Sequence, residues 1–131
     1  MMKLILPFFF LLFLGSSFGQ TPSDVVEAQL KAYNSKDIDA FMNVFSKDVT
    51  LWNLGDSSPW AKGEEQVRSV YAKLFETSPK LNSEVISRTT IGNKVLDYER
   101  ITGRKEGDVL FLIMVYEVSE GKIFRATAIR E

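Results

Sequence analysis

The stretch VVEAQLKAYNSKDIDAFMNVFSKDVTLWN, residues 25–53, predicts two helices followed by the first strand of a sheet. In its first part, large or apolar side chains recur on one helical face, at Val25, Val26, Gln29, Leu30 and Tyr33. The polar run 34–36 breaks this helix, and Asp37 can cap a second one. The apolar side of the second helix carries Ile38, Phe41, Met42 and Phe45, and residues 46–48 end it. The β-branched and aromatic run 49–54 then predicts a strand.

The chain on either side of this stretch completes an α+β pattern. Thr21 can cap the first helix and Pro22 suits its first turn. Residues 55–62 form a polar loop that holds Trp60, which we expect to fold back onto an apolar surface. A third helix opens at Gly63 and stops at Ser78-Pro79. Four strands follow, at residues 81–91, 94–103, 109–119 and 121–130, with tight turns between the first two and the last two.

This order predicts a single α+β domain with three helices in its N-terminal half. We expect a long, curved antiparallel sheet whose concave side is covered by the helices. Such an arrangement leaves a cavity between the two layers.

The first nineteen residues differ from the rest and predict a signal peptide. Lys3 precedes an apolar run from Leu4 to Leu14, and small residues occur at Ser17 and Gly19. The run is roughly half of the about 20 residues that a spanning helix needs, so we expect no stable membrane span. We therefore divide the chain into a signal peptide, 1–19, and a domain, 20–131, exported to the periplasm or beyond the cell.

Two residue types are absent from the whole chain, and both absences limit the chemistry. With no cysteine, thiol catalysis and thiolate metal sites are excluded. With no histidine, the commonest general base and the commonest metal ligand are missing. We expect no metal and no cofactor, since no calcium-type or phosphate-binding loop is present either. The formal net charge of −1 and the lack of a basic face argue against a nucleic-acid partner.

Several stretches resemble the nuclear transport factor 2-like superfamily, which includes ketosteroid isomerases, SnoaL-type polyketide cyclases and limonene epoxide hydrolases. They are residues 25–53, GEEQVRSVYAKLF (63–75), GNKVLDYERITGR (92–104) and VYEVSEGKIFRATAIRE (115–131). The most telling are NSKDIDAF and the EGKI before the last strand. The resemblance covers nearly all of residues 20–131 and implies the cone-shaped α+β fold.

The same resemblance argues against ketosteroid isomerase chemistry. Those enzymes need an aspartate base at the end of the first strand, and Asn53 stands there. They need a tyrosine on the first helix and a protonated aspartic acid on the third strand of the meander, where Gln29 and Met114 stand. An amide cannot serve as the base. We expect no isomerase activity by that mechanism.

Strand 94–103 supplies the candidate catalytic residues. Because side chains alternate between faces, Asp97 and Glu99 share one face and lie about 7 Å apart. The resemblance implies that this face lines the cavity, where burial and like charge raise the pKa of a carboxyl group. If the strand faces the other way, both are solvated surface acids.

The candidate ligand-binding residues come from every part of the domain. Arg130 either pairs with Glu99 or an anionic ligand at the rim of the cavity, or is a solvated chain end. Tyrosine hydroxyls could orient a ligand, although aromatic side chains at such spacing often only pack the core. The set is Tyr33, Asn53, Tyr71, Met114, Tyr116 and Arg130.

Three functions remain open from the sequence. The first is an exported protein that binds a small hydrophobic or amphipathic molecule. The second is a small hydrolase or isomerase that uses Asp97 and Glu99 as acid and base. The third is a dimeric interaction module without a ligand. Strand 109–119 is almost continuously apolar, so we expect both of its faces to be covered, one of them in a homodimer.

Overall fold

The structure is a computed structural model that describes Lys3 and residues 20–131. Apart from Lys3, the predicted signal peptide lies outside these described residues. Three helices and six strands follow one another in the order α1 (Pro22–Ser35), α2 (Ile38–Asn43), β1 (Phe45–Asn53), β2 (Ala61–Lys62), α3 (Glu64–Thr77), β3 (Asn82–Ile91), β4 (Lys94–Thr102), β5 (Leu110–Ser119) and β6 (Lys122–Ile129). The predicted α+β class is confirmed. Within the described residues, no helix is long and apolar enough to cross a membrane.

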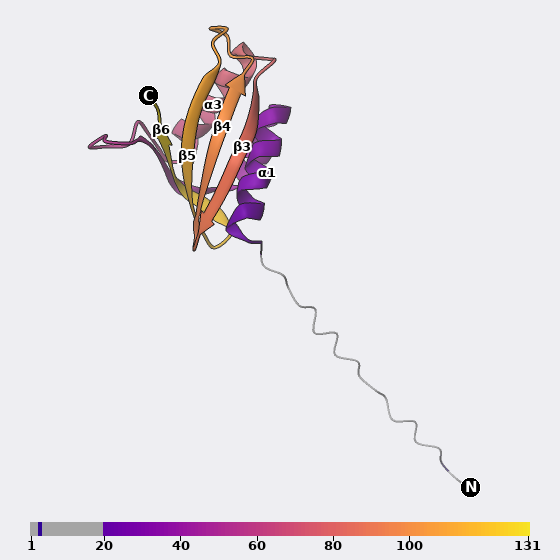
Figure 1. The fold of residues 1–131 in the computed structure, drawn as a ribbon. Coiled ribbons are helices and arrows are strands. Elements are labelled where there is room, and N and C mark those ends of the chain that lie inside the picture. Colours follow the sequence, from indigo (N-terminus) through magenta and orange to yellow (C-terminus); the bar gives the residue numbers. More distant parts are fainter. Residues whose placement is uncertain (1–2, 4–19) are drawn as a thin grey trace.

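One curved sheet holds all six strands, in the order β2-β1-β6-β5-β4-β3. Neighbouring strands are antiparallel except β1 and β6, which run parallel. The sheet does not close on itself, so β2 and β3 are its edges. In Figure 1 strands β3 to β5 stand side by side, α3 lies behind them and α1 runs along the β3 side.

An aromatic cluster lies between the helices and the sheet. Phe41 of α2 is fully buried and lies with its ring centroid 4.5 Å from that of Tyr71 and 4.9 Å from that of Phe45. Tyr33 of α1 packs edge-on against Phe75 of α3, at 5.7 Å. These contacts join all three helices to β1 and form one side of the interior.

The junction between α1 and α2 ties the helices to the sheet. The Asn34 side chain donates to the backbone oxygen of Ser83 and accepts from its backbone nitrogen, at 3.0 and 2.7 Å. Lys36 adopts the left-handed conformation and its Nζ donates to Leu81 O at 3.0 Å. Asp37 accepts from Ala40 N and caps α2, as predicted. This stretch therefore fixes α1 against the start of β3.

The structure corrects four local predictions. Helix α2 ends at Asn43, and Phe45 belongs to β1, which starts four residues earlier than predicted. The predicted loop 55–62 ends in the short strand β2. The sheet contains one parallel pair, because β1 lies beside the last strand of the meander. Alternation along the last strand, with Ala126 inward, predicts Ile123 on the outer face, but Ile123 is fully buried, because a register shift between Glu117 and Val118 turns the start of β6 inward.

Candidate functional site

A cavity of about 220 Å³ lies between the helices and the concave face of the sheet. Its walls are mostly apolar and come from α1, α3 and strands β3 to β5. Trp60, just before β2, and Arg130, just after β6, also line it. The lining residues are Gln29, Leu30, Tyr33, Trp60, Val70, Tyr71, Leu74, Leu81, Ser83, Glu99, Ile101, Arg104, Leu110, Leu112, Met114, Tyr116 and Arg130. A concave apolar site with a few polar groups is the usual form of a small-molecule site.

Glu99 is the one carboxylate among these lining residues, and it is 4% exposed. The hydroxyl of Tyr116 donates to Glu99 Oε1 at 3.3 Å. The pKa of Glu99 is raised from 4.5 to about 7, mainly by burial and in addition by the nearby charge of Asp97. The Tyr116 hydrogen bond and Arg88 act in the opposite direction. A carboxyl group with this pKa can both donate and accept a proton near neutral pH.

Two residues that line the cavity each carry a buried oxygen atom without a protein partner. Gln29 Oε1 and Ser83 Oγ are both buried and make no hydrogen bond within the described part of the chain. Gln29 comes from α1 and Ser83 from the start of β3, so they lie on adjoining walls. Unpaired buried polar atoms are costly, and a bound molecule with matching groups would satisfy them.

The tyrosine hydroxyls of the cavity stay protonated at neutral pH. Burial raises the pKa of Tyr71 to about 12, and the charge of Glu99 adds to this effect. Burial likewise raises the pKa values of Tyr33 and Tyr116 above the usual range of a phenol. These groups are therefore hydrogen-bond donors or acceptors for a ligand and not bases.

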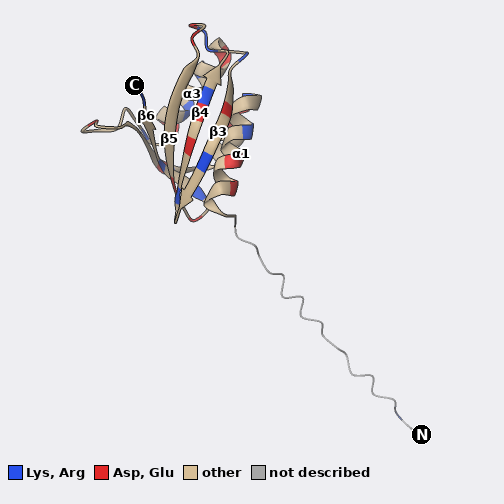
Figure 2. Cartoon of the chain, in the orientation of Figure 1, with Lys and Arg blue, Asp and Glu red and all other residues tan. Residues whose placement is uncertain are grey.

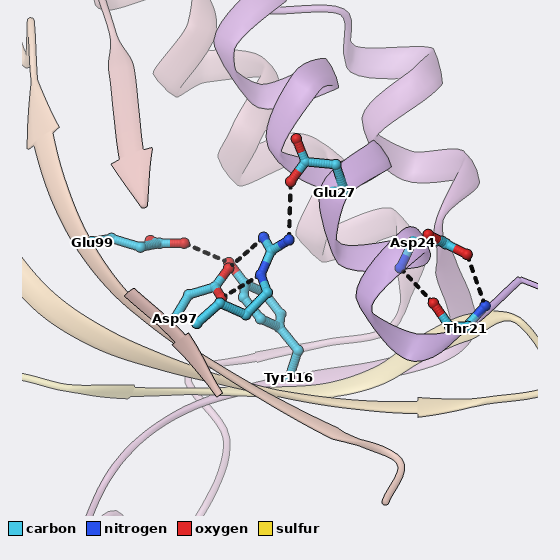
Figure 3. A network of polar contacts seen from close by, with 7 residues as sticks. Thr21, Asp24, Glu27, Asp97, Glu99 and Tyr116 are labelled. Atoms are coloured by element: carbon cyan, nitrogen blue, oxygen red, sulfur yellow. Dashed lines mark hydrogen bonds and ion pairs between the residues drawn. The ribbon is translucent and has the colours of Figure 1, made fainter. Parts of the chain in front are cut away.

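Asp97 is held in a separate polar network between α1, β3 and β4 (Figure 3). Arg88 of β3 donates from Nε to Asp97 Oδ1 at 2.7 Å and from Nη2 to Oδ2 at 2.9 Å. Its Nη1 donates to Glu27 of α1 at 3.0 Å. Asp97 raises the pKa of Arg88 by these hydrogen bonds, so the guanidinium stays charged. The network occupies the carboxylate of Asp97 and links α1 to the sheet.

The face of β4 was predicted correctly, but its two acids are placed differently. Asp97 and Glu99 are both buried on the inner side, as the resemblance implied. Only Glu99 lines the cavity, while Asp97 is bound by Arg88. A pair of free carboxylates is therefore not present, because one of them has a fixed cationic partner.

Five of the six residues expected to bind a ligand surround the cavity: Tyr33, Tyr71, Met114, Tyr116 and Arg130. Asn53 does not line it. It lies at the end of β1, where its backbone nitrogen donates to Asp56, and its Oδ1 is buried without a partner. Trp60 lines the cavity, as its predicted fold-back suggested, but remains 44% exposed.

The sequence did not single out Gln29, Ser83, Arg88 or Arg104 as part of the site or its supporting network. Gln29 was noted on the inner face of the first helix, at a position where ketosteroid isomerases have a tyrosine, but not as a ligand-binding residue. Ser83 and Arg88 lie on a strand with no clear polar-apolar alternation, and Arg104 lies in the polar turn after β4. Within the described residues, no group of three or more acidic side chains could hold a metal ion.

Residues 26–126 match the model of the SnoaL-like domain family. No curated protein sequence matches the chain at a significant level. A solved cystatin fold protein from Novosphingobium aromaticivorans is 24% identical, with a TM-score of 0.78, over 86% of this chain and 100% of that one.

Two other solved structures illustrate the range of similar proteins. A putative polyketide cyclase from Sinorhizobium meliloti is 20% identical, with a TM-score of 0.69, over 80% of this chain and 93% of that one. A protein with a ketosteroid isomerase-like fold from Catenulispora acidiphila, solved in complex with trimethylamine, is 16% identical, with a TM-score of 0.69, over 83% and 85% of the two chains. At these identities the likeness shows the fold alone.

Proposed function

The chain belongs to the SnoaL-like domain family, and we propose that it is an exported protein that binds a small hydrophobic or amphipathic molecule in its cavity. The observation that supports this most directly is that Gln29 and Ser83, which line a mostly apolar cavity, each carry a buried oxygen atom, Oε1 and Oγ, without a hydrogen-bond partner. Polar groups left unpaired in such a place are explained by a ligand that completes their hydrogen bonds. The trimethylamine complex of the Catenulispora acidiphila protein is consistent with this proposal, since it records a small molecule with the same fold.

A titration with indole tests the binding proposal. Indole is small, neutral and aromatic, with one N–H donor, so it suits an apolar cavity that holds free acceptors. We expect ¹H–¹⁵N NMR shifts in the mature chain, residues 20–131, at amides around Leu81, Leu112 and Met114. Leu112→Trp fills the cavity and should abolish these shifts. Phe111→Trp, one residue away on the outer face, is the matched control and should keep them.

Either of two results contradicts the proposal. Indole binding that survives Leu112→Trp would place the molecule elsewhere on the protein. Absence of binding to the unaltered chain at millimolar indole, with the fold intact, would leave the cavity without a ligand-binding role. In that case the interaction module would be the better reading.

Glu99 supports a second candidate function, general acid–base catalysis. Its pKa of about 7 suits proton transfer at neutral pH, and the Tyr116 hydroxyl beside it can stabilise developing charge. Asp97 would then act through Glu99, since Arg88 occupies its own oxygens. Exchange of the α-protons of cyclohexanone in deuterated water is a simple assay. Catalysis predicts exchange that Glu99→Gln abolishes, and equal exchange with and without protein argues for binding alone.

Export rests on the sequence of residues 1–19. We propose cleavage after Gly19, so that Gln20 becomes the first residue of the mature protein. When the full chain is made in a bacterium, we expect it in the periplasm or the medium, with Gln20 at its N-terminus. An intact N-terminus in the cytoplasmic fraction would contradict export.

We also propose that the chain forms a homodimer through the outer face of the sheet. Tyr98 and Phe111 are 39% and 47% exposed there, with ring centroids 6.2 Å apart, and Ile113 and Val115 continue the apolar surface. Figure 2 shows β5 in tan over most of its length, in agreement with its one charged residue, Glu117. An apolar patch of this kind is typical of a protein interface.

A further inference from the structure

The chemistry of the cavity differs between its inner side and its solvent side. Gln29, Ser83 and Glu99 are 6%, 4% and 4% exposed, so the atoms Gln29 Oε1, Ser83 Oγ and the Glu99 carboxyl lie well away from water. Gln29 Oε1 is an acceptor, the Ser83 hydroxyl can accept as well as donate, and the Glu99 carboxyl accepts when it is ionised. The inner side therefore favours a ligand group that donates a hydrogen bond, an O–H or an N–H.

Two arginines line the same cavity and extend toward solvent. Arg130 follows the end of β6 and is exposed, and within residues 20–131 no carboxylate lies within ion-pair distance of it. Arg104 lies in the turn after β4 and makes one long ion pair, from Nε to Glu106 Oε2 at 3.8 Å, with a partner that is 60% exposed. Such a solvated pair contributes little, so Arg104 is available to a second anion. Two cations at the open side favour an anionic ligand group.

The register of the sheet relates Glu99 to Arg130. Glu99 lies opposite Leu112 on β5, and Ile113 lies opposite Ile129 on β6, so the next residue, Arg130, continues the row of Glu99 and Leu112. With neighbouring strands about 4.8 Å apart, two strand spacings put the Cα atoms of Glu99 and Arg130 about 10 Å apart. Both line the cavity, yet they form no ion pair. The cavity wall between Glu99 and Arg130 is apolar, because it is formed by Leu112 and the neighbouring Met114 of β5.

We propose that the ligand is a small amphipathic acid. Its anionic group binds Arg130 and Arg104, its apolar body lies over Leu112 and Met114, and its O–H or N–H group donates to the acceptors of Gln29, Ser83 and Glu99. This inference rests on the proposed binding function and specifies the ligand class. A cavity of about 220 Å³ is below the roughly 300 Å³ of typical drug-sized sites, so a single ring with a short side chain is a fitting size.

Three probes of similar size test the contributions of the two polar ends of the proposed ligand separately. They are 3-(4-hydroxyphenyl)propanoate, which has both groups, 3-phenylpropanoate, which lacks the hydroxyl, and 4-propylphenol, which lacks the acid. Titration calorimetry of the mature chain at neutral pH gives each dissociation constant. We expect the probe with both groups to bind about tenfold more tightly than either of the others, because each end adds at least one hydrogen bond, one of them charge-assisted.

Variants assign the two ends to residues. Arg130→Gln should weaken both acids about tenfold and leave 4-propylphenol unchanged. Gln29→Leu should remove the advantage of the hydroxyl while keeping the need for the acid. Arg125→Gln is the matched control: Arg125 lies on β6 with its guanidinium over the Trp52 ring, and it does not line the cavity. It should change none of the three constants.

The outcomes distinguish this inference from the binding function on which it rests. If 4-propylphenol binds as tightly as the hydroxy acid, or if Arg130→Gln changes nothing, the anionic end is wrong while the binding function stands. If 3-phenylpropanoate binds as tightly as the hydroxy acid, the inner donor is wrong. If indole binds in the cavity and neither acid does, the ligand class is overturned and the cavity remains a binding site.

Discussion

Arg88 of β3 donates two hydrogen bonds to the carboxylate of Asp97 on β4, from Nε to Oδ1 at 2.7 Å and from Nη2 to Oδ2 at 2.9 Å. Asp97 is fully buried, so its charge is stable in the interior only because this guanidinium lies beside it. Arg88 also donates to Glu27 on α1, and the network therefore joins a helix to two strands.

Replacement of Arg88 should destabilise the domain strongly. In Arg88→Gln the Asp97 carboxylate stays buried without its partner, and we expect a loss of roughly 3–5 kcal/mol in the free energy of unfolding. Urea denaturation measures this loss. The double variant Arg88→Met, Asp97→Leu removes both charges and should recover most of the stability, because no uncompensated ion remains.

Arg100 and Glu84 provide the control for Arg88, because they form a cross-strand pair between the same two strands. Their contact is 3.9 Å long, and their side chains are 43% and 64% exposed. Arg100→Gln should cost less than about 1 kcal/mol, since solvent screens the pair. Equal losses in Arg88→Gln and Arg100→Gln would show that burial does not govern the Arg88 pair.

Local patterns in the sequence sufficed for the elements and for the inner face of β4. The capping groups Thr21 and Asp37 mark helix starts, and the structure has both caps. The alternation from Val95 to Ile101 predicts one buried face, and all four inward residues on it are buried. Such patterns depend on near neighbours in the chain, which is why the sequence carries them.

The role of Arg88 could not be predicted, because it depends on an irregularity of β3. Ser83 faces inward, and strict alternation from it would turn Arg88 outward. A register shift between Val85 and Ser87 reverses the alternation, so that Arg88 lies opposite Asp97. Nothing in the local sequence NSEVISRTTI marks this bulge. Phe45 was misplaced for a similar reason, since its partner in the sheet, Ile123, lies far along the chain.

Glu99 should make the stability of the protein depend on pH. A carboxyl group whose pKa is raised from 4.5 to about 7 on folding binds its proton more tightly in the folded state. Its contribution is fully present below pH 4.5 and is lost as the pH rises through about 7. The difference between these pKa values corresponds to on the order of 3 kcal/mol, at about 1.4 kcal/mol for each unit.

The measurement is the difference in unfolding free energy between Glu99→Gln and the unaltered protein at about pH 5 and about pH 8. Because glutamine does not ionise, the variant should gain stability relative to the unaltered protein as the pH rises. Glu84→Gln, which removes an exposed carboxyl group, should show no such trend. A Glu99→Gln difference that stays constant between the two pH values would contradict a raised pKa.

Gly103 should tolerate no side chain, because the chain after β4 passes directly over the backbone before β3. Its φ is +75°, and an added Cβ would lie 1.8 Å from Lys80 O. Gly103→Ala therefore requires the backbone to move, and we expect a loss of about 2 kcal/mol or more in thermal or urea unfolding. Gly107→Ala is the control, since its φ of +82° is similar but its surroundings are open, and it should cost about 1 kcal/mol. Similar losses in the two variants would mean that φ alone matters.

The outer face of the sheet should carry the interface of the proposed homodimer. In Phe111→Glu a charge replaces an aromatic side chain that packs against Tyr98 on this face and is 47% exposed in the single chain. Burying that carboxylate in an interface is costly, so light scattering at micromolar concentration should give two chains for the unaltered protein and one for the variant. Leu54→Glu is the control, because Leu54 is 67% exposed but lies in the loop after β1, and this variant should remain a dimer.

Because Phe111 is already partly solvated in the single chain, indole binding in the cavity should persist in the Phe111→Glu monomer. A monomeric unaltered protein would contradict the dimer without affecting the cavity, whereas loss of indole binding on dissociation would show that the partner completes the site.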